Sequence, residues 1–212
     1  MTEHLPGAIG RLYSTHESLF KDAGLACGPG CSVCCTDRVI ATTLEARAIF
    51  RHLKDGGHED LLARALAATG RDIYRPTATV NALARMCMER KEPPGEPEAE
   101  VSVCPLLDGG LCTVYELRPL ACRAQMSETA CRHGGEAVMD ELSVTLNQVF
   151  FQAAEHLDQG GLTGNLMDLL AFLSGGPALR LQKNEPVPGL LVPAGHFGRA
   201  RTLLHELLEV KP

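Results

Sequence analysis

The chain has 212 residues, of which 45% are hydrophobic and 22% are charged, and its formal net charge is -6. This length suits one globular domain with room for an appendage, and such a chain buries a core without needing cross-links. The acidic balance, the lack of a basic run and an aromatic content of 4% argue against nucleic acid as a partner. No stretch approaches the ~20 apolar residues of a membrane span, and the amino terminus lacks the pattern of a signal peptide. We therefore expect a cytoplasmic protein with no membrane partner.

The first part of the chain has the periodicity of amphipathic helices. Apolar positions from Ile9 to Ala23 follow the 3.6-residue period, which predicts a helix there. A second helix is predicted after Thr42 and Glu45, which stand at capping-box spacing, and Gly56 is expected to end it.

Two further helices are predicted over residues 58–69 and 78–90. In the second of these, Cys87 lies on an apolar stripe between Leu83 and Met88. A cysteine in such a place acts as a small hydrophobic side chain, so we expect Cys87 to be buried in the core and to take no part in chemistry.

The middle of the chain changes character. Residues 91–100 carry three prolines and four glutamates and are predicted to form a surface loop. After them, β-forming residues flank Asp108-Gly109-Gly110, which is a hairpin signal, and Arg118-Pro119 ends the strand.

Helical periodicity returns in the last third, over residues 142–157, 166–173 and 197–208, with an irregular stretch at 175–195. The predicted fold class is therefore mainly α: a helical domain in which two cysteine-rich loops and a short β-hairpin converge on a metal centre. We divide the chain into a cysteine-cluster domain with a helical insertion, residues 1–135, and a helical carboxy-terminal extension packed on it, residues 136–212.

Eight of the nine cysteines fall in two clusters that we expect to be non-helical. In a reducing compartment, clustered thiols bind metal or do redox chemistry more often than they form disulfides. Glycines and a proline between the first cysteines let the backbone curl several thiolates around one ion. The candidate metal ligands are Cys27, Cys31, Cys34, Cys35, Cys104, Cys112, Cys122 and Cys131.

Ligand arithmetic leaves three arrangements open. A closed zinc or iron–sulfur site takes four thiolates, so eight cysteines suit two four-ligand sites, one bridged two-metal cluster, or one site with four thiols left over. Cys34 and Cys35 are neighbours, and on extended backbone their side chains would point apart. In that case we expect them to bind at two adjacent sites, or one to bind a metal while the other faces a substrate, and not to bind the same ion.

Basic residues next to these cysteines are candidate counterions. Four thiolates around a divalent ion carry excess negative charge, which requires nearby cations or hydrogen-bond donors. Arg118 and Arg123 are therefore expected to support the bound cofactor, and Arg132 is a further candidate. His133 is an alternative ligand to Cys131, because imidazole binds both zinc and iron.

The two cysteine blocks resemble a known family. Cys27, Cys31, Cys34 and Cys35, followed by Cys104-Pro105-Leu106, Cys112, Val114-Tyr115, Arg118-Pro119 and Cys122-Arg123, are similar to the zinc- or iron-chelating family described by a CxxCxxCC motif, the YkgJ type. The resemblance covers roughly residues 27–131 and implies metal binding by the eight cysteines. A similar domain occurs in flagellin lysine N-methylases, where an iron–sulfur cluster is implied. Ala124-Gln125-Met126 departs from the aromatic residue and proline that often follow the Cys-Arg pair.

The spacing of Cys27, Cys31 and Cys34 also equals that of radical S-adenosylmethionine enzymes, whose three cysteines hold a 4Fe–4S cluster with one open iron. Val33 replaces their usual aromatic residue, and the strand–helix alternation of a partial barrel is absent. The spacing is still compatible with an iron–sulfur cluster that has one open iron and is held by the same cysteines.

Two classes of function follow. In the first, the protein binds metal ions, as zinc or iron or an iron–sulfur centre such as 4Fe–4S, and is a scaffold or metal-handling module. In the alternative, it is an iron–sulfur enzyme for group transfer, such as protein methylation, or for redox chemistry. The sequence names no catalytic residue or substrate, because phosphate-binding loops, nucleophile elbows and dinucleotide fingerprints are all missing.

Overall fold

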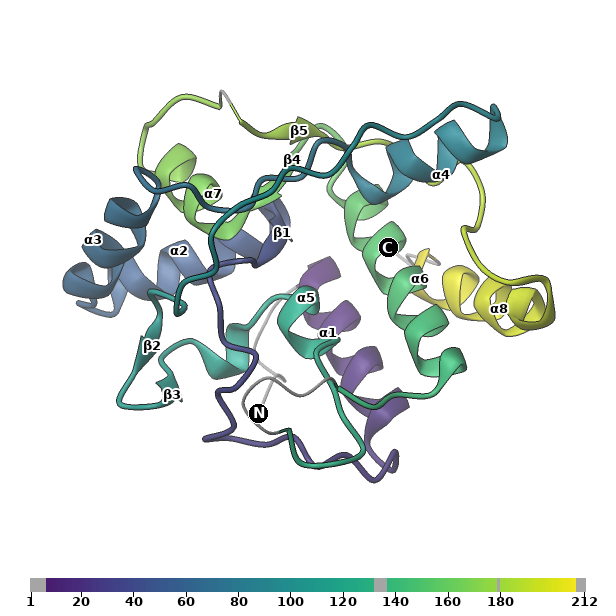
Figure 1. Ribbon diagram of the computed structural model, residues 1–212, viewed down its shortest axis with the longest axis horizontal. Coiled ribbons are helices and arrows are strands. Elements are labelled where there is room, and N and C mark those ends of the chain that lie inside the picture. The colour runs from purple at the N-terminus through teal and green to yellow at the C-terminus, as the bar shows by residue number, and fades with distance from the viewer. Residues whose placement is uncertain (1–6, 132–136, 179, 209–212) are drawn as a thin grey trace.

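The computed structural model describes residues 7–131, 137–178 and 180–208. Helices dominate this part of the chain, and short strands connect them (Figure 1). The α-helices are α1 (Gly7–Phe20), α2 (Thr43–Asp55), α3 (Glu59–Ala68), α4 (Val80–Met88), α5 (Leu120–Arg123), α6 (Glu141–Leu157), α7 (Leu166–Leu173) and α8 (Phe197–Leu208), with 3-10 turns η2 (Tyr115–Leu117) and η3 (Ala194–His196). The strands are β1 (Ile40–Thr42), β2 (Leu107–Asp108), β3 (Leu111–Cys112), β4 (Leu162–Asn165) and β5 (Gln182–Lys183).

The helices predicted from periodicity are present, and the best-defined boundary is the start of α2. The Thr42 hydroxyl accepts the Glu45 backbone N–H at 3.3 Å, and the Thr42 N–H donates to Glu45 Oε2 at 2.9 Å, which is the predicted capping box. Gly56 follows the helix, and its N–H donates to the His52 carbonyl at 3.0 Å. Local sequence therefore fixes both ends of this helix.

The fold is mixed α/β, which corrects the mainly α prediction. Besides the hairpin β2–β3, the chain forms an antiparallel sheet in the order β1-β4-β5. Ile40 pairs with Asn165 and Thr42 with Thr163, so the sheet joins segments more than 100 residues apart. Strands of two to four residues are too short to show the period-2 alternation that predicts a strand.

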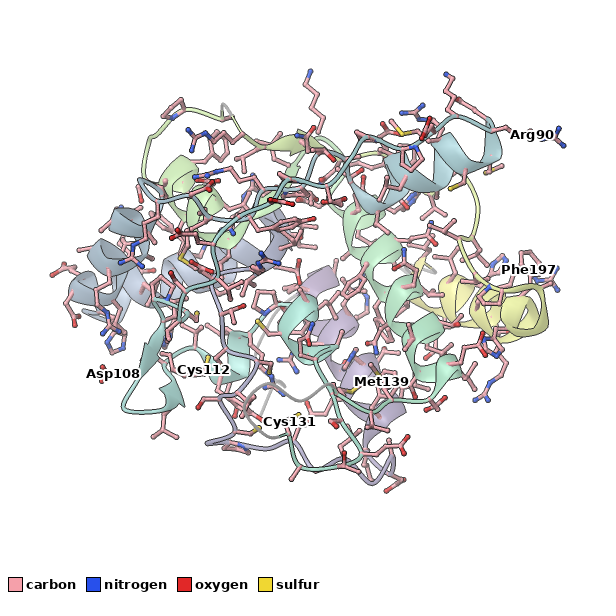
Figure 2. The ribbon with its side chains drawn as sticks, viewed as in Figure 1. Arg90, Asp108, Cys112, Cys131, Met139 and Phe197 are labelled. Atoms are coloured by element: carbon pink, nitrogen blue, oxygen red, sulfur yellow. The ribbon has the colours of Figure 1, made fainter. Side chains whose placement is uncertain are left out.

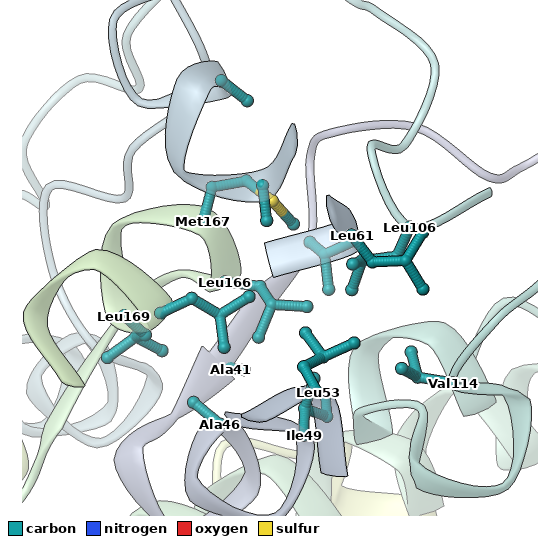
Figure 3. Packing of buried hydrophobic residues seen from close by; sticks show 14 of the residues in the cluster. Ala41, Ala46, Ile49, Leu53, Leu61, Leu106, Val114, Leu166, Met167 and Leu169 are labelled. Atoms are coloured by element: carbon teal, nitrogen blue, oxygen red, sulfur yellow. The ribbon is translucent and has the colours of Figure 1, made fainter. Parts of the chain in front are cut away.

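Buried apolar side chains form two cores. One is built on β1, α2, α3 and α7, shown at the left and top of Figure 1, and includes Ile49, Leu53 and Met167 (Figure 3). The other joins α1, α5, α6 and α8 around Tyr13 and Phe150. Each core draws on both sides of residue 135, because α7 packs on α2 and α6 packs on α1. The division of the chain at that residue stays a prediction.

Three buried carboxylates tie the two cores together. Each accepts a backbone N–H in the first turn of a helix elsewhere in the chain: Glu45 from Leu120 at 2.8 Å, Glu155 from Asn81 at 2.8 Å and Asp158 from Leu44 at 3.0 Å. Helix N-termini have free N–H groups and a positive dipole end, so they stabilise a buried negative charge. Gly161 allows this packing, because a Cβ there would collide with the Asp158 carboxylate and the Thr43 hydroxyl.

The prediction that Cys87 is buried is wrong. Cys87 is exposed and Met88 is 64% exposed, whereas Asn81, Ala82 and Ala84 face inward. Asn81 donates from its side chain to the Gln152 carbonyl at 3.0 Å and also accepts from the Gln152 amide at 3.1 Å. The hydrogen bonds between Asn81 and Gln152 set the rotation of α4 about its axis, and in this orientation Cys87 and Met88 face solvent.

The length and composition of the helices can be compared with those of a membrane span. Among the described residues, no helix combines the length and the apolar character needed to span a bilayer.

Candidate metal centre

The two cysteine blocks are held side by side by backbone hydrogen bonds. Thr36 and Val103 form an antiparallel bridge, the Asp37 N–H donates to the Ser102 carbonyl at 3.0 Å, and the Cys104 N–H donates to the Cys35 carbonyl at 3.1 Å. Backbone hydrogen bonds therefore bring the two cysteine loops together, as predicted.

The predicted hairpin brings Cys112 to the same place. Gly109 and Gly110 have φ values of +54° and +81°, which is left-handed backbone that suits glycine in a two-residue hairpin turn. Leu107 pairs with Cys112 across the hairpin, and the Thr113 N–H donates to the Leu106 carbonyl at 3.0 Å.

Cys122 differs from the prediction that all eight candidate ligands lie outside helices. It lies in α5, a single helical turn that begins after Pro119. The Glu45 carboxylate accepts the Leu120 N–H and so replaces the missing helical acceptor at the start of this turn. That acceptor comes from 75 positions away, which is why the local sequence did not reveal the helix.

Seven of the eight candidate cysteines line one cavity of about 660 Å³. They are Cys27, Cys31, Cys34, Cys35, Cys104, Cys112 and Cys122. Cys131 does not line this cavity, but its loop is tied to the first cysteine block, because the Ala26 N–H donates to the Ser127 carbonyl at 2.8 Å. Figure 2 shows Cys112 on the hairpin and Cys131 in the lower part of the molecule.

The electrostatic neighbours of Cys27, Cys35, Cys104 and Cys122 sort the eight thiols into two groups. Cys35, Cys104, Cys112 and Cys122, which we call the inner thiols, influence one another. Cys27 is influenced by Cys31, Cys34 and Cys131, and we call these four the outer thiols. Cys34 also influences Cys35 and Cys122, so it stands between the groups.

Cys34 and Cys35 do not have the extended backbone on which their side chains would point apart. The chain turns here, with the Cys35 N–H donating to the Ser32 carbonyl at 3.0 Å and the Thr36 N–H to the Cys34 carbonyl at 2.9 Å. The two thiols are hydrogen-bonded to each other. This bond lowers the pKa of Cys34 to about 6 and raises the pKa of Cys35. The pair therefore favours a thiolate on the exposed Cys34 and a thiol on Cys35.

Burial keeps the remaining inner thiols protonated. It raises the pKa of Cys104 to about 11, and it raises the pKa values of Cys112 and Cys122, with further increases for Cys122 from neighbouring cysteines. A metal ion binds thiolates, so loading this site would displace protons. In the described part of the chain, no three cysteine, histidine, aspartate or glutamate side chains stand in a ready-made ligand arrangement. The donor set suits a soft metal.

Arg118 and Arg123 both line the cavity, but they are held differently. Arg118 lies over the Tyr115 ring, 3.8 Å from its centroid. Burial raises the pKa of Cys112, and a backbone hydrogen bond and the charge of Arg118 lower it in part. Arg123 is buried, with Cζ 4.1 Å from the Tyr13 ring centroid, and donates to the carbonyls of Arg118 at 3.0 Å and Glu116 at 2.7 Å. Arg132 and His133, the other two candidates from the sequence, lie outside the described residues.

The other wall of the cavity was not predicted from the sequence. It comes from α1 and the following loop, with His16, Phe20, Lys21 and Leu25, and from Met126. His16 is buried, and its Nε2 lies 2.9 Å from Asn147 Oδ1. Burial lowers the pKa of His16 to about 4. The only sequence signal was the position of His16 on the apolar stripe of its helix.

Comparison with known proteins gives no further guidance, because no protein-family model, curated protein or solved structure matches this chain.

Proposed function

We propose that this protein binds zinc or iron, the latter as an ion or in an iron–sulfur centre such as 4Fe–4S, through its eight clustered cysteines. The observation that supports the proposal most is the single cavity lined by seven cysteines from two separate blocks. Soft thiolate ligands select zinc and iron–sulfur clusters over hard cations such as magnesium. The cysteines are free thiols, and in a reducing compartment clustered thiols bind metal more often than they form disulfides.

Two groups of four thiols suit two four-ligand sites or one bridged two-metal cluster. The inner thiols supply Cys35, Cys104, Cys112 and Cys122 from three segments, and the outer thiols supply the other four. Cys34, which touches both groups electrostatically, is the residue that would bridge them in a two-metal cluster. We therefore expect more than one metal atom per chain, because a closed site takes four thiolates.

The test is the metal content and colour of protein purified without oxygen. Elemental analysis gives the metal, and absorption near ~400 nm distinguishes iron–sulfur from colourless zinc. Cys122→Ser should lower the metal content, whereas Cys87→Ser is the matched control, because Cys87 is an exposed cysteine that does not line the cavity. Less than about half an equivalent of metal in the parent, or equal loss in both variants, would contradict the proposal.

A second candidate is an iron–sulfur enzyme for group transfer, such as protein methylation, or for redox chemistry. The observation in its favour is the size of the cavity, because about 660 Å³ lies in the range of small-molecule sites and exceeds the needs of a metal centre. Its non-cysteine wall, with Phe20, Leu25 and Lys21, offers apolar surface and a cation to an organic substrate. Colourless protein with stoichiometric zinc would exclude this candidate.

A further inference from the structure

A second cavity, of about 400 Å³, lies where the two cores meet. Its walls come from β1, α5, α6, the start of α4 and β4. One contributor, Ala41, belongs to the first core, whereas Leu120 and Ala154 belong to the second. Small-molecule sites occur preferentially at such junctions, and this volume is in their lower range.

The cavity has two kinds of wall. Along α6, Val144, Gln148, Phe151 and Glu155 face it at spacings of four, three and four residues, which is one continuous helical stripe. The facing wall is made largely of small side chains, including Ala41, Ala78, Ala121 and Ala124, which leave space in front of the stripe. Val144 is 51% exposed, so the stripe reaches solvent at this end. Met139, also in the lining, lies just before α6 (Figure 2).

The charges around the cavity have one sign. Among the described residues that line it, the ionisable side chains are Glu45 and Glu155, which are 3% and 1% exposed, and there is no lysine, arginine or histidine. Within the described part of the chain neither glutamate forms an ion pair. Their oxygens accept hydrogen bonds from backbone N–H groups and, for Glu45, from the Thr42 hydroxyl. Burial raises the pKa of both carboxyls, so a cation entering this space would be attracted and would stabilise their ionised form, whereas an anion would be repelled.

We propose that this cavity binds a small organic cation, an apolar amine whose ammonium group is attracted by the Glu45 and Glu155 carboxyls and whose hydrocarbon part fills the alanine-lined space. Gln148, whose side chain makes no hydrogen bond within the described residues, offers a carbonyl oxygen to the same ammonium group. Phe151 offers an aromatic ring, which also attracts cations. Ala121 and Gln125 line this cavity and the cysteine cavity alike, but no part of this inference requires a metal.

The test compares three probes of similar shape and different charge: 2-phenylethylamine, 2-phenylethanol and 3-phenylpropionate. Each is titrated into the protein as isolated, at pH 7, and heat and thermal stability are recorded. We expect saturable binding of the amine with Kd of about 0.1–1 mM, about tenfold weaker binding of the alcohol and none of the carboxylate. An alcohol that binds as well as the amine, or an amine that does not saturate, would overturn the proposal.

A filled-cavity variant places the binding in this cavity. Ala124→Leu adds side-chain volume to the wall, and it should weaken amine binding by about tenfold or more. Ala67→Leu is the matched control, because Ala67 is an exposed alanine of α3 that does not line the cavity. Equal affinity in Ala124→Leu and the parent would overturn the location. Metal content is measured in the same samples, so a failure of the amine site is distinguished from a failure of the cysteine site.

Discussion

The two cavities share Ala121 and Gln125 but are built in opposite ways. The cysteine cavity is formed largely by loops and one-turn elements, and its thiols repel one another when ionised. The second cavity is formed by helices and strands, and its carboxyls are already hydrogen-bonded to helix N-termini. On the proposed function a metal completes the cysteine cavity, whereas the carboxyls of the second cavity already have partners within the protein.

Metal removal should produce the largest contrast between them. The loop at residues 27–35 contributes no side chain to either core, and in the segment 101–112 only Leu106 is buried in one. A bound metal would therefore supply folding energy to both loops, about 10 kcal/mol for structural zinc in small domains. We expect a chelator to lower amide protection in both loops while α6 keeps its protection. Hydrogen exchange on loaded and stripped protein measures this. Unchanged loops would contradict the claim that the metal orders them.

Removing one buried carboxyl should destabilise the helical region. Glu45→Ala takes away the acceptor for the Thr42 and Leu120 N–H groups and leaves these buried donors unpaired, at a cost of about 3 kcal/mol. Glu59→Ala is the control, because Glu59 is an exposed glutamate in the first turn of α3, where about 0.5 kcal/mol is expected. Urea unfolding measures both. Similar losses in the two variants would show that the Glu45 hydrogen bonds are not important.

Acid should weaken the wall of the cysteine cavity formed by α1. Because the folded-state pKa of His16 is about 4 and the ordinary value is 6.5, the unfolded chain binds the proton first as pH falls. Stability from this residue is therefore present above pH 6.5 and lost between 6.5 and about 4, by about 3 kcal/mol in all. His16→Gln should remove this part of the pH dependence. Identical pH profiles for parent and variant would refute it.

The smallest expected effect separates the two arginines. Arg118→Gln removes a cation that lowers the pKa of Cys112, and should weaken metal retention by about tenfold, with partial rescue by Arg118→Lys. Arg123→Gln should also weaken metal retention, but it additionally breaks two hydrogen bonds to carbonyls and so lowers stability. Chelator competition and urea unfolding distinguish these outcomes. Arg64→Gln is the control, since Arg64 only pairs at the surface with Asp108.

Features that depend on near neighbours could be predicted from the sequence. The capping box of Thr42 and Glu45, the Gly109-Gly110 turn and the long amphipathic helices are set by local hydrogen bonding and backbone preference. The clustering of the cysteines was also evident, because their spacing is read directly from the sequence.

Features that depend on distant partners could not be predicted from the sequence. The register of β1 with β4 and the helical turn that carries Cys122 need residues far along the chain, namely Asn165 and Glu45. Cys87 faces solvent because the Asn81 pair with Gln152 sets the rotation of α4, and no periodicity in one helix reveals which polar residue has a buried partner. The second cavity has the same origin: alanines are ordinary in helices and strands, and they enclose a space only where two cores meet.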